Sequence, residues 1–314
     1  MDTRRALLDA LESGPVSGPE LADRLGVSRA AVWKHVEALR DQGFEIESGD
    51  EGYHITETPN YGAAAIQYGS TAPYGIEFHD TINSTNDRAR ELADAGNTGI
   101  AVVADEQTGG RGRLDRDWAA PAGGIYVSVA ISPDLPPAQA PIVTLAAAVA
   151  VTDACRDVGA DAHIKWPNDV LVPDPTAERG GTKLAGILTE MQGEADRVSW
   201  IVVGIGINAN VDPDALPPGA TSLRAATGDR IDRSRVTRTL LERFHELTAA
   251  PESVLPAWRD RAATIGRDVR VETTTGAVEG TAVDVEFPGA LVLETDDGTE
   301  TVLSGDCEHL RPID

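Results

Sequence analysis

Ten consecutive residues, 109–118, combine the residue types that bind anionic ligands. The stretch reads Gly-Gly-Arg-Gly-Arg-Leu-Asp-Arg-Asp-Trp and holds three glycines, three arginines and a tryptophan. Glycine has no Cβ, so backbone amides can approach an anion closely, and arginine forks match phosphate or carboxylate oxygens in pairs. Trp118 offers a flat face for stacking a ring. The stretch predicts a loop that holds a nucleotide phosphate beside a second anion, although composition alone also allows a flexible, solvated loop.

The order of these glycines excludes two common nucleotide-binding loops. No Gly-x-x-x-x-Gly-Lys-Ser/Thr string occurs in the chain, so it has no P-loop. A dinucleotide fingerprint needs Gly-x-Gly-x-x-Gly, and residues 110–115 end in Asp115 instead of the third glycine. The arginine loop, as we call residues 109–118, therefore belongs to neither class.

Four further groups of residues suit a ligand site. Ser84, Thr85 and Asn86 precede a helix, where hydroxyls and terminal amides can hold a polar ligand, although they are also ordinary helix caps. Residues 165–170, Lys-Trp-Pro-Asn-Asp-Val, place a cation, an amide and a carboxylate on one turn. Two more groups begin and end strands, with a lysine at the start of 183–188 and spaced glycines in 204–210. Each group is a weak signal alone, but together they indicate one site.

The composition is strongly acidic and poor in lysine. The 314 residues include 51 Asp and Glu against 27 Lys and Arg, which gives a formal net charge of −24. Only three of the basic residues are lysines, so Lys165 and Lys183 are expected where a compact, mobile ammonium is needed. Salt screens the repulsion between surface carboxylates. We interpret the composition as that of a halophilic protein.

Cysteine usage and hydropathy indicate a soluble, cytoplasmic protein. Cys155 and Cys307 lie far apart and show no metal-ligand spacing, so we expect free thiols in a reducing cytosol and no metal held by the protein. We recognise no signal peptide, and no apolar run is expected to reach the roughly 18 residues of a membrane span. The sequence therefore predicts no association with a membrane.

Residues 1–60 have the pattern of a winged helix-turn-helix. Helices are expected over 3–12, over 18–25 and between Ser28 and Gly43, and residues 44–55 alternate about a turn as a hairpin does. The exposed face of the third helix would present a basic and aromatic set to a DNA major groove, namely Arg29, Trp33 and Lys34.

The charge of this first region leaves two interpretations open. Residues 1–60 carry six Lys and Arg against twelve Asp and Glu, whereas a DNA-binding domain is normally basic. The objection is weaker in a salt-rich cytosol, because salt already suppresses binding to phosphates. We favour DNA binding, with a docking or vestigial role as the alternative.

The rest of the chain divides into a linker, a large mixed region and a small β region. Residues 61–75 are rich in Gly, Ala and Pro and predict a linker with one short helix. Residues 76–265 mix strands with helices, including an almost wholly apolar helix over 138–158 that is expected to be buried. Residues 266–314 read as short alternating strands of a small β-barrel. The fold class is therefore predicted to be α+β.

Together these motifs resemble those of the biotin protein ligases. The family's Gly-Arg-Gly-Arg-x-Gly-Arg-x-Trp corresponds to residues 110–118, its Lys-Trp-Pro-Asn-Asp to 165–169, its Lys-Leu-x-Gly-Ile-Leu to 183–188 and its Gly-x-Gly-x-Asn to 204–208. The resemblance covers essentially the whole chain. It implies a central mixed-sheet catalytic domain of the biotin/lipoate ligase type and a C-terminal SH3-like β-barrel. The winged helix resembles that of bifunctional members, which also repress biotin operons.

One position departs from the family pattern. Asp115 stands where the family usually has glycine. Asp tolerates left-handed backbone better than most residues, so the loop is expected to keep its shape. Its carboxylate among phosphate-binding arginines is expected to weaken nucleotide affinity or slow the ordering of the loop.

The resemblance implies an ATP-dependent, AMP-forming ligase. Biotin and ATP would form biotinyl-5′-AMP with Mg²⁺ on the phosphates, and biotin would pass to a lysine of a biotin carboxyl-carrier protein. The implied biotin contacts are Ser84, Thr85, Asn86, Gln107, Arg111, Gly112, Arg113, Lys183, Gly186, Gly204 and Gly206. The implied ATP contacts are Arg113, Arg116, Trp118, Lys165, Asn168, Lys183 and Asn208. The catalytic assignments are Arg113, Lys183 and Asp169, the last to orient or deprotonate the acceptor lysine.

Further partners and two alternative functions follow from the same comparison. Operator DNA is an expected partner, and the family implies a homodimer formed through the central sheet. One alternative is a biotin-sensing, DNA-binding repressor without catalysis, which would use the same ligand site. The other is a lipoate or octanoate ligase of related fold, which the Lys-Trp-Pro-Asn-Asp and Gly-Arg-Gly-Arg strings disfavour.

Overall fold

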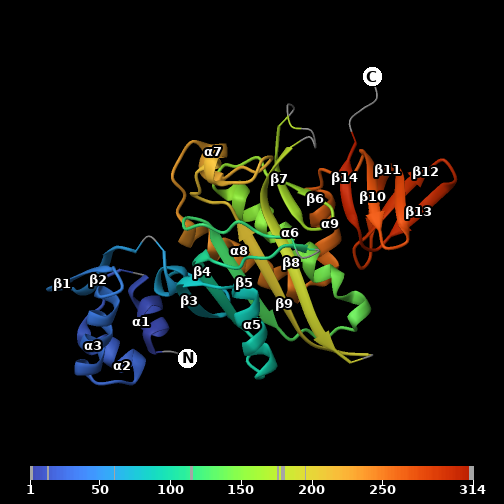
Figure 1. Cartoon of the computed structure of the whole chain (residues 1–314). Coiled ribbons are helices and arrows are strands. Elements are labelled where there is room, and N and C mark those ends of the chain that lie inside the picture. Colours follow the sequence, from blue (N-terminus) through green and yellow to red (C-terminus); the bar gives the residue numbers. More distant parts are fainter. Residues whose placement is uncertain are drawn as a thin grey trace. The chain divides into compact units, whose positions relative to one another are not determined.

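The computed structural model groups the chain into two compact units. It describes residues 3–12, 14–59, 61–113, 116–174, 177, 181–194 and 196–310 (Figure 1). The first unit comprises Met1–Ala72 with Asp232–Arg238, and the second comprises Pro73–Ile231 with Thr239–Asp314.

The first unit contains a winged helix-turn-helix. Helices α1 (Thr3–Glu12), α2 (Gly18–Leu25) and α3 (Arg29–Arg40) precede an antiparallel wing of β1 (Glu45–Gly49) and β2 (Gly52–Glu57). Serine side chains cap α2 and α3 by accepting hydrogen bonds from amides of the first turn. The apolar positions of the helices form the core, and the buried ones include Leu7, Leu8, Leu11, Val32, Val36 and Leu39. The predicted winged helix is confirmed.

The segment predicted as a linker includes a packed helix. Helix α4 (Ala63–Gln67) buries Ala64, Ala65 and Ile66. Arg238 fixes its end, because Nη1 donates to the carbonyl oxygens of Ala65 and Tyr68 at 2.9 and 2.8 Å. The short helix expected in this segment is therefore part of the first unit.

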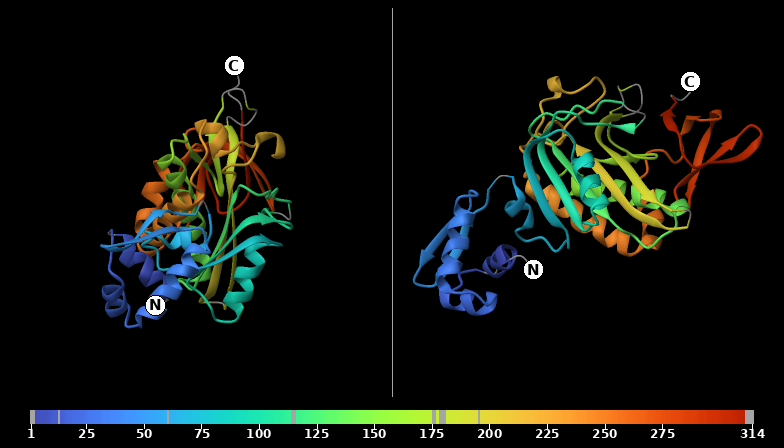
Figure 2. Two further views of the ribbon diagram at one scale, coloured as in Figure 1. Left: turned by 90° about the vertical axis from the view of Figure 1, so that its left-hand side faces the viewer. Right: turned by 60° about the horizontal axis from the view of Figure 1, so that its bottom comes forward.

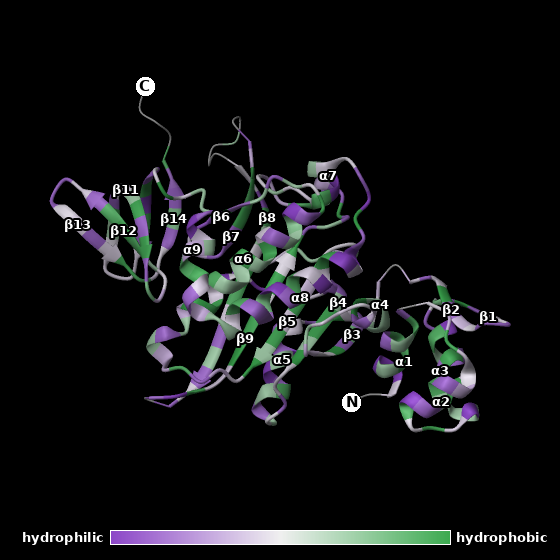
Figure 3. Cartoon of the chain, turned by 180° about the vertical axis from the view of Figure 1, so that it is seen from behind, coloured by the Kyte–Doolittle hydropathy of each residue, from purple (hydrophilic) through white to green (hydrophobic). Residues whose placement is uncertain are grey.

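A seven-stranded mixed sheet forms the centre of the second unit. The strand order is β3-β4-β5-β9-β8-β7-β6, with β3 and β4 parallel and the other neighbours antiparallel. Figure 3 shows the central strands hydrophobic along most of their length. The bounds are β3 (Gly75–Ile82), β4 (Ile100–Gln107), β5 (Ile125–Ile131), β6 (His163–Lys165), β7 (Asp169–Pro173), β8 (Gly181–Gly193) and β9 (Val198–Ile207).

Two helices cover opposite faces of this sheet (Figure 2). Successive residues of a strand point to opposite faces. Helix α5 (Thr85–Asp94) packs on the face that includes Val102 and Val202. On the other face, Thr144 of α6 (Pro141–Asp157) lies 2.8 Å from Thr189 of β8 between hydroxyl oxygens. Strand β9, in the middle of the sheet, therefore presents one set of side chains to α5 and the alternate set to α6.

Helix α6 corrects one expectation from the sequence. No apolar run of membrane-spanning length was expected, but Pro137–Asp157 is long and apolar enough by length and composition to cross a membrane. Twelve residues of α6 are buried, however. A helix that is apolar all round belongs in a protein core or a membrane, and here the sheet and neighbouring helices provide the core.

The remaining helices of the chain are short, apart from α8. Asp153 of α6 binds two arginines, with 2.5 Å to Arg261 Nε and 3.0 Å to Arg243 Nε. Residues 251–259 form a 3₁₀ turn followed directly by a short α-helix. The segments are η2 (Pro137–Gln139), η3 (Pro213–Ala215), α7 (Leu223–Thr227), α8 (Arg233–Ala249), η4 (Pro251–Ser253) and α9 (Val254–Arg259).

The chain ends in a five-stranded antiparallel sheet. Its order is β13-β12-β11-β10-β14, so the first and last strands of this domain are neighbours. Trp166 ties it to the central sheet, because Nε1 donates to the carbonyl oxygen of Gly289 at 2.9 Å. The strands are β10 (Asp268–Thr273), β11 (Gly276–Glu286), β12 (Ala290–Thr295), β13 (Gly298–Val302) and β14 (Asp306–His309). The predicted α+β class, with a small β domain at the end, is confirmed.

Candidate active site

Facing residues on four strands build the floor of the site. The register of the sheet places Tyr126, Gly206, Gly186 and Asp169 opposite one another on β5, β9, β8 and β7. Opposed residues of antiparallel strands share a face, so these four positions form one row on the face of α5. Two of them are glycines, which leaves the row open above β9 and β8. Its end carries the carboxylate of Asp169.

The neighbouring row of residues shows why position 204 is a glycine. Ser128, Gly204 and Leu188 lie opposite one another on β5, β9 and β8. A Cβ on Gly204 would lie 2.0 Å from Oδ1 of Asn86, a distance that real Cβ atoms do not reach. The absence of a side chain at Gly204 therefore gives the Asn86 amide its place on the sheet.

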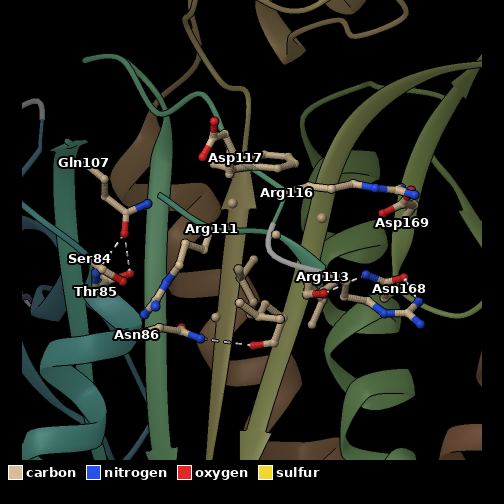
Figure 4. Close-up of a pocket in the computed structure, with 18 of the residues that line it drawn as sticks. Ser84, Thr85, Asn86, Gln107, Arg111, Arg113, Arg116, Asp117, Asn168 and Asp169 are labelled. Carbon is tan, nitrogen blue, oxygen red and sulfur yellow. Dashed lines mark hydrogen bonds between the residues drawn. The ribbon is translucent and has the colours of Figure 1, made fainter. Parts of the chain in front are cut away.

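A buried polar network lies above this row. The Thr85 amide and hydroxyl bond to Oε1 of Gln107 at 2.8 and 3.0 Å, as Figure 4 shows. Ser128 Oγ lies 2.7 Å from Thr85 Oγ1 and 2.6 Å from Asn86 Oδ1. Asn86 Nδ2 donates to Glu190 Oε2 at 2.8 Å. Because these groups are fixed by one another, they present preset donors and acceptors to a polar ligand.

The arginine loop closes on itself and on α5. The Trp118 amide donates to the carbonyl oxygen of Gly110 at 2.9 Å, and the Gly112 amide to that of Arg116 at 2.7 Å. The Arg111 side chain binds the carboxylate of Asp87 on α5. Leu114 lies outside the described residues. Asp115 also does, so its expected effect on the loop stays a prediction.

Two arginines of the loop reach other parts of the unit. Arg113 donates from Nη1 to Asn168 Oδ1 at 2.9 Å (Figure 4) and from Nη2 to the carbonyl oxygen of Gly305 at 2.9 Å. Arg116 Nη2 lies 2.6 Å from Oδ2 of Asp306. The loop is therefore linked both to the turn that follows β6 and to the C-terminal sheet.

Trp118 lies over the open part of the floor. A Cβ on Gly206 would come within 2.7 Å of its indole ring, and a Cβ on Gly186 within 3.0 Å. Lys183 Nζ lies 5.3 Å from the ring centroid, within the range of a cation–π contact, and 2.7 Å from Asp169 Oδ1. The indole Nε1 is buried without a hydrogen-bond partner in the described part of the chain. A ligand acceptor would satisfy that N–H.

Asn208 offers a second buried atom without a partner. Its side chain is 2% exposed, and Nδ2 donates to the carbonyl oxygen of Thr221 at 3.0 Å. Its Oδ1 is buried with no hydrogen-bond partner among the residues that the structure describes. Since buried acceptors without partners are costly, this oxygen fits a donor on a bound molecule.

The predicted ligand residues gather in two adjoining pockets. All eleven residues assigned to biotin line the first pocket, together with Arg116, Trp118, Asn168 and Asp169. Lys165 and Asn208 line the second. Asp117, Trp118, Asp169 and Lys183 border both pockets. The arrangement can hold two ligands on either side of a shared cation and indole.

Several residues near these pockets were not singled out from the sequence. Ser128 is a fully buried polar residue in an otherwise apolar strand. A single polar residue in such a strand needs a hydrogen-bonding partner, so the sequence pattern itself could have identified it. Asp117 stands in the arginine loop itself but received no role. Asp306 and the loop 216–220 also line the pockets. They come from distant parts of the chain, and no local sequence pattern predicts that they reach the site.

The residues predicted to contact DNA lie in the first unit. Arg29, Trp33 and Lys34 are all exposed on α3, and Trp33 is 54% exposed. The wing presents exposed carboxylates instead of basic side chains, namely Glu45, Glu47, Asp50, Glu51 and Glu57. The exposed face of α3 thus agrees with the predicted orientation, while the wing is acidic.

Three family models match the chain in the order of its domains. The HTH domain model matches residues 3–54 and the biotin/lipoate A/B protein ligase family matches residues 78–208. The biotin protein ligase C terminal domain matches residues 264–310.

Curated relatives and a solved structure agree with this assignment. The bifunctional ligase/repressor BirA of Bacillus subtilis is 39% identical over 310 residues, covering 93% of each chain. The protein of the same name from Escherichia coli is 32% identical, covering 89% of this chain and 88% of its own. The biotin protein ligase from Aquifex aeolicus, solved in complex with biotin and ATP, has a TM-score of 0.62 at 27% identity and covers 74% of this chain and 97% of its own. The chain therefore belongs to the biotin protein ligase family, with the N-terminal helix-turn-helix domain of its ligase/repressor members.

Proposed function

We propose that the second unit activates biotin with ATP and transfers it to a lysine of a biotin carboxyl-carrier protein, and that the first unit binds operator DNA. The observation that carries the first part is the shared border of the two pockets. Lys183, Trp118 and Asp169 lie between the residues assigned to biotin and those assigned to the nucleotide, so the two substrates would meet there.

The first pocket suits biotin. Its Thr85–Gln107–Ser128 network is buried or half-buried and offers preset hydrogen bonds to the ureido ring. Gly186 and Gly206 would leave room for a flat bicycle above the strands once the Trp118 ring leaves them. Arg113 and Lys183 would hold the carboxylate, while Arg111 and Gly112 close the pocket. A small set of fixed polar groups in a narrow cavity is typical of small-molecule sites.

The second pocket suits the nucleotide. Trp118 would stack on adenine, and Asn208 Oδ1 would accept a hydrogen bond from the exocyclic amine, which supplies its missing partner. Arg116, Lys165 and Asn168 would contact the phosphates. The Trp118 ring now lies over Gly186 and Gly206, which are assigned to biotin, so entry of biotin would require the ring to leave this position.

The first reaction step joins two anions. A biotin carboxylate oxygen attacks the α-phosphorus of ATP, the bond to the bridging oxygen breaks, and pyrophosphate leaves. Arg113 and Lys183 would lower the barrier by cancelling the charge that builds at phosphorus, because fixed cations in a water-poor pocket need no reorganisation. The product is a mixed anhydride that water hydrolyses, so the arginine loop would also serve as a lid.

The second step needs a neutral amine from the carrier. A lysine has an unperturbed pKa near 10.4, so only about one in a few thousand is neutral at pH 7. The amine attacks the acyl carbon of biotinyl-5′-AMP, and AMP leaves. Asp169 would orient or deprotonate the lysine. Its Oδ1 now binds Lys183, so this role requires Lys183 to turn toward the substrate.

The residues present fit a Mg²⁺ ion that arrives with ATP. No group of three or more His, Cys, Asp and Glu that could hold a metal occurs among the described residues. Mg²⁺ commonly keeps several waters and binds substrate phosphates with one or two carboxylates, and Asp117 and Asp169 both lie at the shared border. When bound, the ion would neutralise phosphate charge.

Transfer of labelled biotin to a carrier domain, measured in molar salt with ATP, tests the ligase. We expect transfer that requires ATP and is lost in Lys183→Ala. Retained biotin binding without transfer would instead support the biotin-sensing repressor. Transfer of lipoate or octanoate in place of biotin would support the ligase of related fold, and absence of biotin binding would refute the site.

The exposed α3 supports the DNA-binding part of the proposal. Fluorescence anisotropy with operator fragments should show binding that Lys34→Glu weakens, with ligase activity unchanged. Because the wing is acidic, few phosphates would be neutralised, so the slope of log affinity against log salt should be shallow. Equal binding by Lys34→Glu and the unsubstituted chain would place DNA contacts elsewhere.

We further propose a cytoplasmic, salt-adapted homodimer that forms through the central sheet. Strand β8 pairs with β7 only up to Gly186 but with β9 up to Gly193. Residues 188–193 therefore form an edge that a second copy can extend, since unpaired edges attract strands. Sedimentation velocity with and without biotin and ATP tests this. Met191→Lys, on that edge and 50% exposed, should favour the monomer.

A further inference from the structure

One carboxylate of the C-terminal sheet lies inside the ligand site. Asp306 is the first residue of β14 and lines the first pocket. Its Oδ2 lies 2.6 Å from Arg116 Nη2, and the carbonyl oxygen of the preceding residue, Gly305, accepts a hydrogen bond from Arg113 at 2.9 Å. The C-terminal domain thus supplies two oxygen atoms to the arginine loop.

The surroundings keep this carboxyl ionised. Burial raises the pKa of Asp306, but the hydrogen bond from Arg116 and the charges of Arg116, Lys165 and Arg113 outweigh burial and hold the pKa below its usual value. Asp306 therefore carries a negative charge at neutral pH. The three cations whose charges act on it are those assigned above to the phosphates and to the biotin carboxylate.

We propose that Asp306 is a competing anion, which occupies Arg116 of the phosphate site until ATP displaces it. The inference rests on the proposed assignment of Arg116 and Lys165 to the phosphates. Arg116 cannot give its full attraction to a phosphate while it binds Asp306, so part of the binding energy of ATP is used to displace the carboxylate. After pyrophosphate forms, the carboxylate competes again for Arg116 and favours release of this product.

Two other roles for Asp306 predict different results when its charge is removed. If its bond to Arg116 only held the loop in place, then loss of the carboxylate would leave the loop less ordered and weaken ATP binding. If Asp306 held Mg²⁺ on the phosphates, then its loss would raise the Mg²⁺ concentration that the reaction requires. A competing anion alone predicts tighter binding of the nucleotide when the charge is removed.

The test uses Asp306→Asn in the full chain, because asparagine keeps the shape and an acceptor for Arg116 but loses the charge. ATP, pyrophosphate and adenosine are titrated by calorimetry. We expect ATP and pyrophosphate to bind about two- to fivefold more tightly, the range of a partly exposed ion pair, and adenosine to bind unchanged. The gain should shrink as KCl rises, because salt screens the competing charge.

Asp284→Asn is the matched control, because Asp284 forms an Asp–Arg pair of the same length, 2.6 Å to Arg259 Nε, away from the pocket. It should leave ATP affinity unchanged. Unchanged or weaker ATP binding in Asp306→Asn, or a raised Mg²⁺ requirement, would overturn the competitor role while ATP binding by the unsubstituted chain upholds the proposed function. Absence of ATP binding by the unsubstituted chain would refute both.

Discussion

The two faces of the central sheet use the same strands in opposite ways. Toward α6, strands β8 and β9 present branched apolar side chains such as Ile187 and Val203, which are at most 2% exposed. On the other face, alternate residues of the same strands are Gly186, Gly204 and Gly206. Alternation along each strand separates the two sets, because neighbouring residues of a strand point to opposite sides of the sheet.

Because of this difference, one face of the sheet mainly stabilises the fold, and the other face carries the proposed ligand site. The α6 face buries large apolar side chains, which is the main favourable term in folding. Over Gly186, Gly204 and Gly206 the other face gives up that burial, because the proposed ligand needs an open floor there. Substitutions on the two faces should therefore have different consequences, and each prediction below tests whether they do.

The largest effect is expected for Arg113→Ala on the site face. Its side chain donates to Asn168 and Gly305 and would neutralise charge in adenylate formation. Loss of one such donor costs about 100- to 1000-fold in rate, measured as biotin-dependent exchange of pyrophosphate into ATP. The control is Arg270→Ala, which removes an exposed arginine of the C-terminal sheet and should leave the rate unchanged. Equal rates for Arg113→Ala and the unsubstituted chain would remove the loop from catalysis.

A pair of substitutions three residues apart on β9 compares the faces directly. Gly206→Ala would bring a Cβ to 2.7 Å from the Trp118 ring and restrict the space that ligand and tryptophan share. We expect about a tenfold rise in the KM for biotin, in line with the 1–3 kcal/mol of overpacking, with little change in unfolding free energy. Val203→Ala, on the α6 face, should lower the unfolding free energy by about 2 kcal/mol and keep both KM values.

Steady-state kinetics and chemical denaturation of both variants check this comparison. A destabilised Gly206→Ala with normal kinetics would contradict the division of the two faces. The same holds if Val203→Ala raises the KM while it keeps its stability.

The sequence predicts local structure and the open floor much better than contacts between distant segments. Ser28 caps α3 as expected, because an N-cap needs only its own first turn. The glycine spacing of β9 indicates an open surface for the same local reason. Asp306 meets Arg116 across 190 residues, and that meeting depends on how the C-terminal sheet docks. No pattern in either segment encodes it.

Apolar composition alone also does not distinguish a membrane-spanning helix from a helix buried in a protein core. Pro137–Asp157 satisfies the length and hydropathy of a membrane span, yet α6 lies in a protein core. Both settings remove the helix from water, so both select the same side chains. The packed contacts that distinguish them are visible in the structure alone.

A smaller effect is expected for Ser128→Ala on the site face. The hydroxyl lies between Thr85 and Asn86, and its loss leaves one of these buried oxygens without a partner. We expect the unfolding free energy to fall by about 1–3 kcal/mol and biotin affinity to fall several-fold, since the network positions Gln107. Calorimetry with biotin and denaturation by urea measure the two changes. Full biotin affinity in this variant would show that the network serves stability alone.

The smallest effect is expected on the α6 face, in the hydroxyl pair Thr144–Thr189. The two oxygens are 2.8 Å apart and join α6 to β8 behind the site. Each single change to valine should cost about 0.5–1.5 kcal/mol, the net value of a hydrogen bond. The double variant should cost less than the sum, because neither hydroxyl is then left without its partner. Ligase kinetics should be unchanged in all three variants. A raised KM for biotin in Thr189→Val would show that the backbone of β8 transmits strain from one face to the other, and the separation of stability from chemistry would then apply to side chains only.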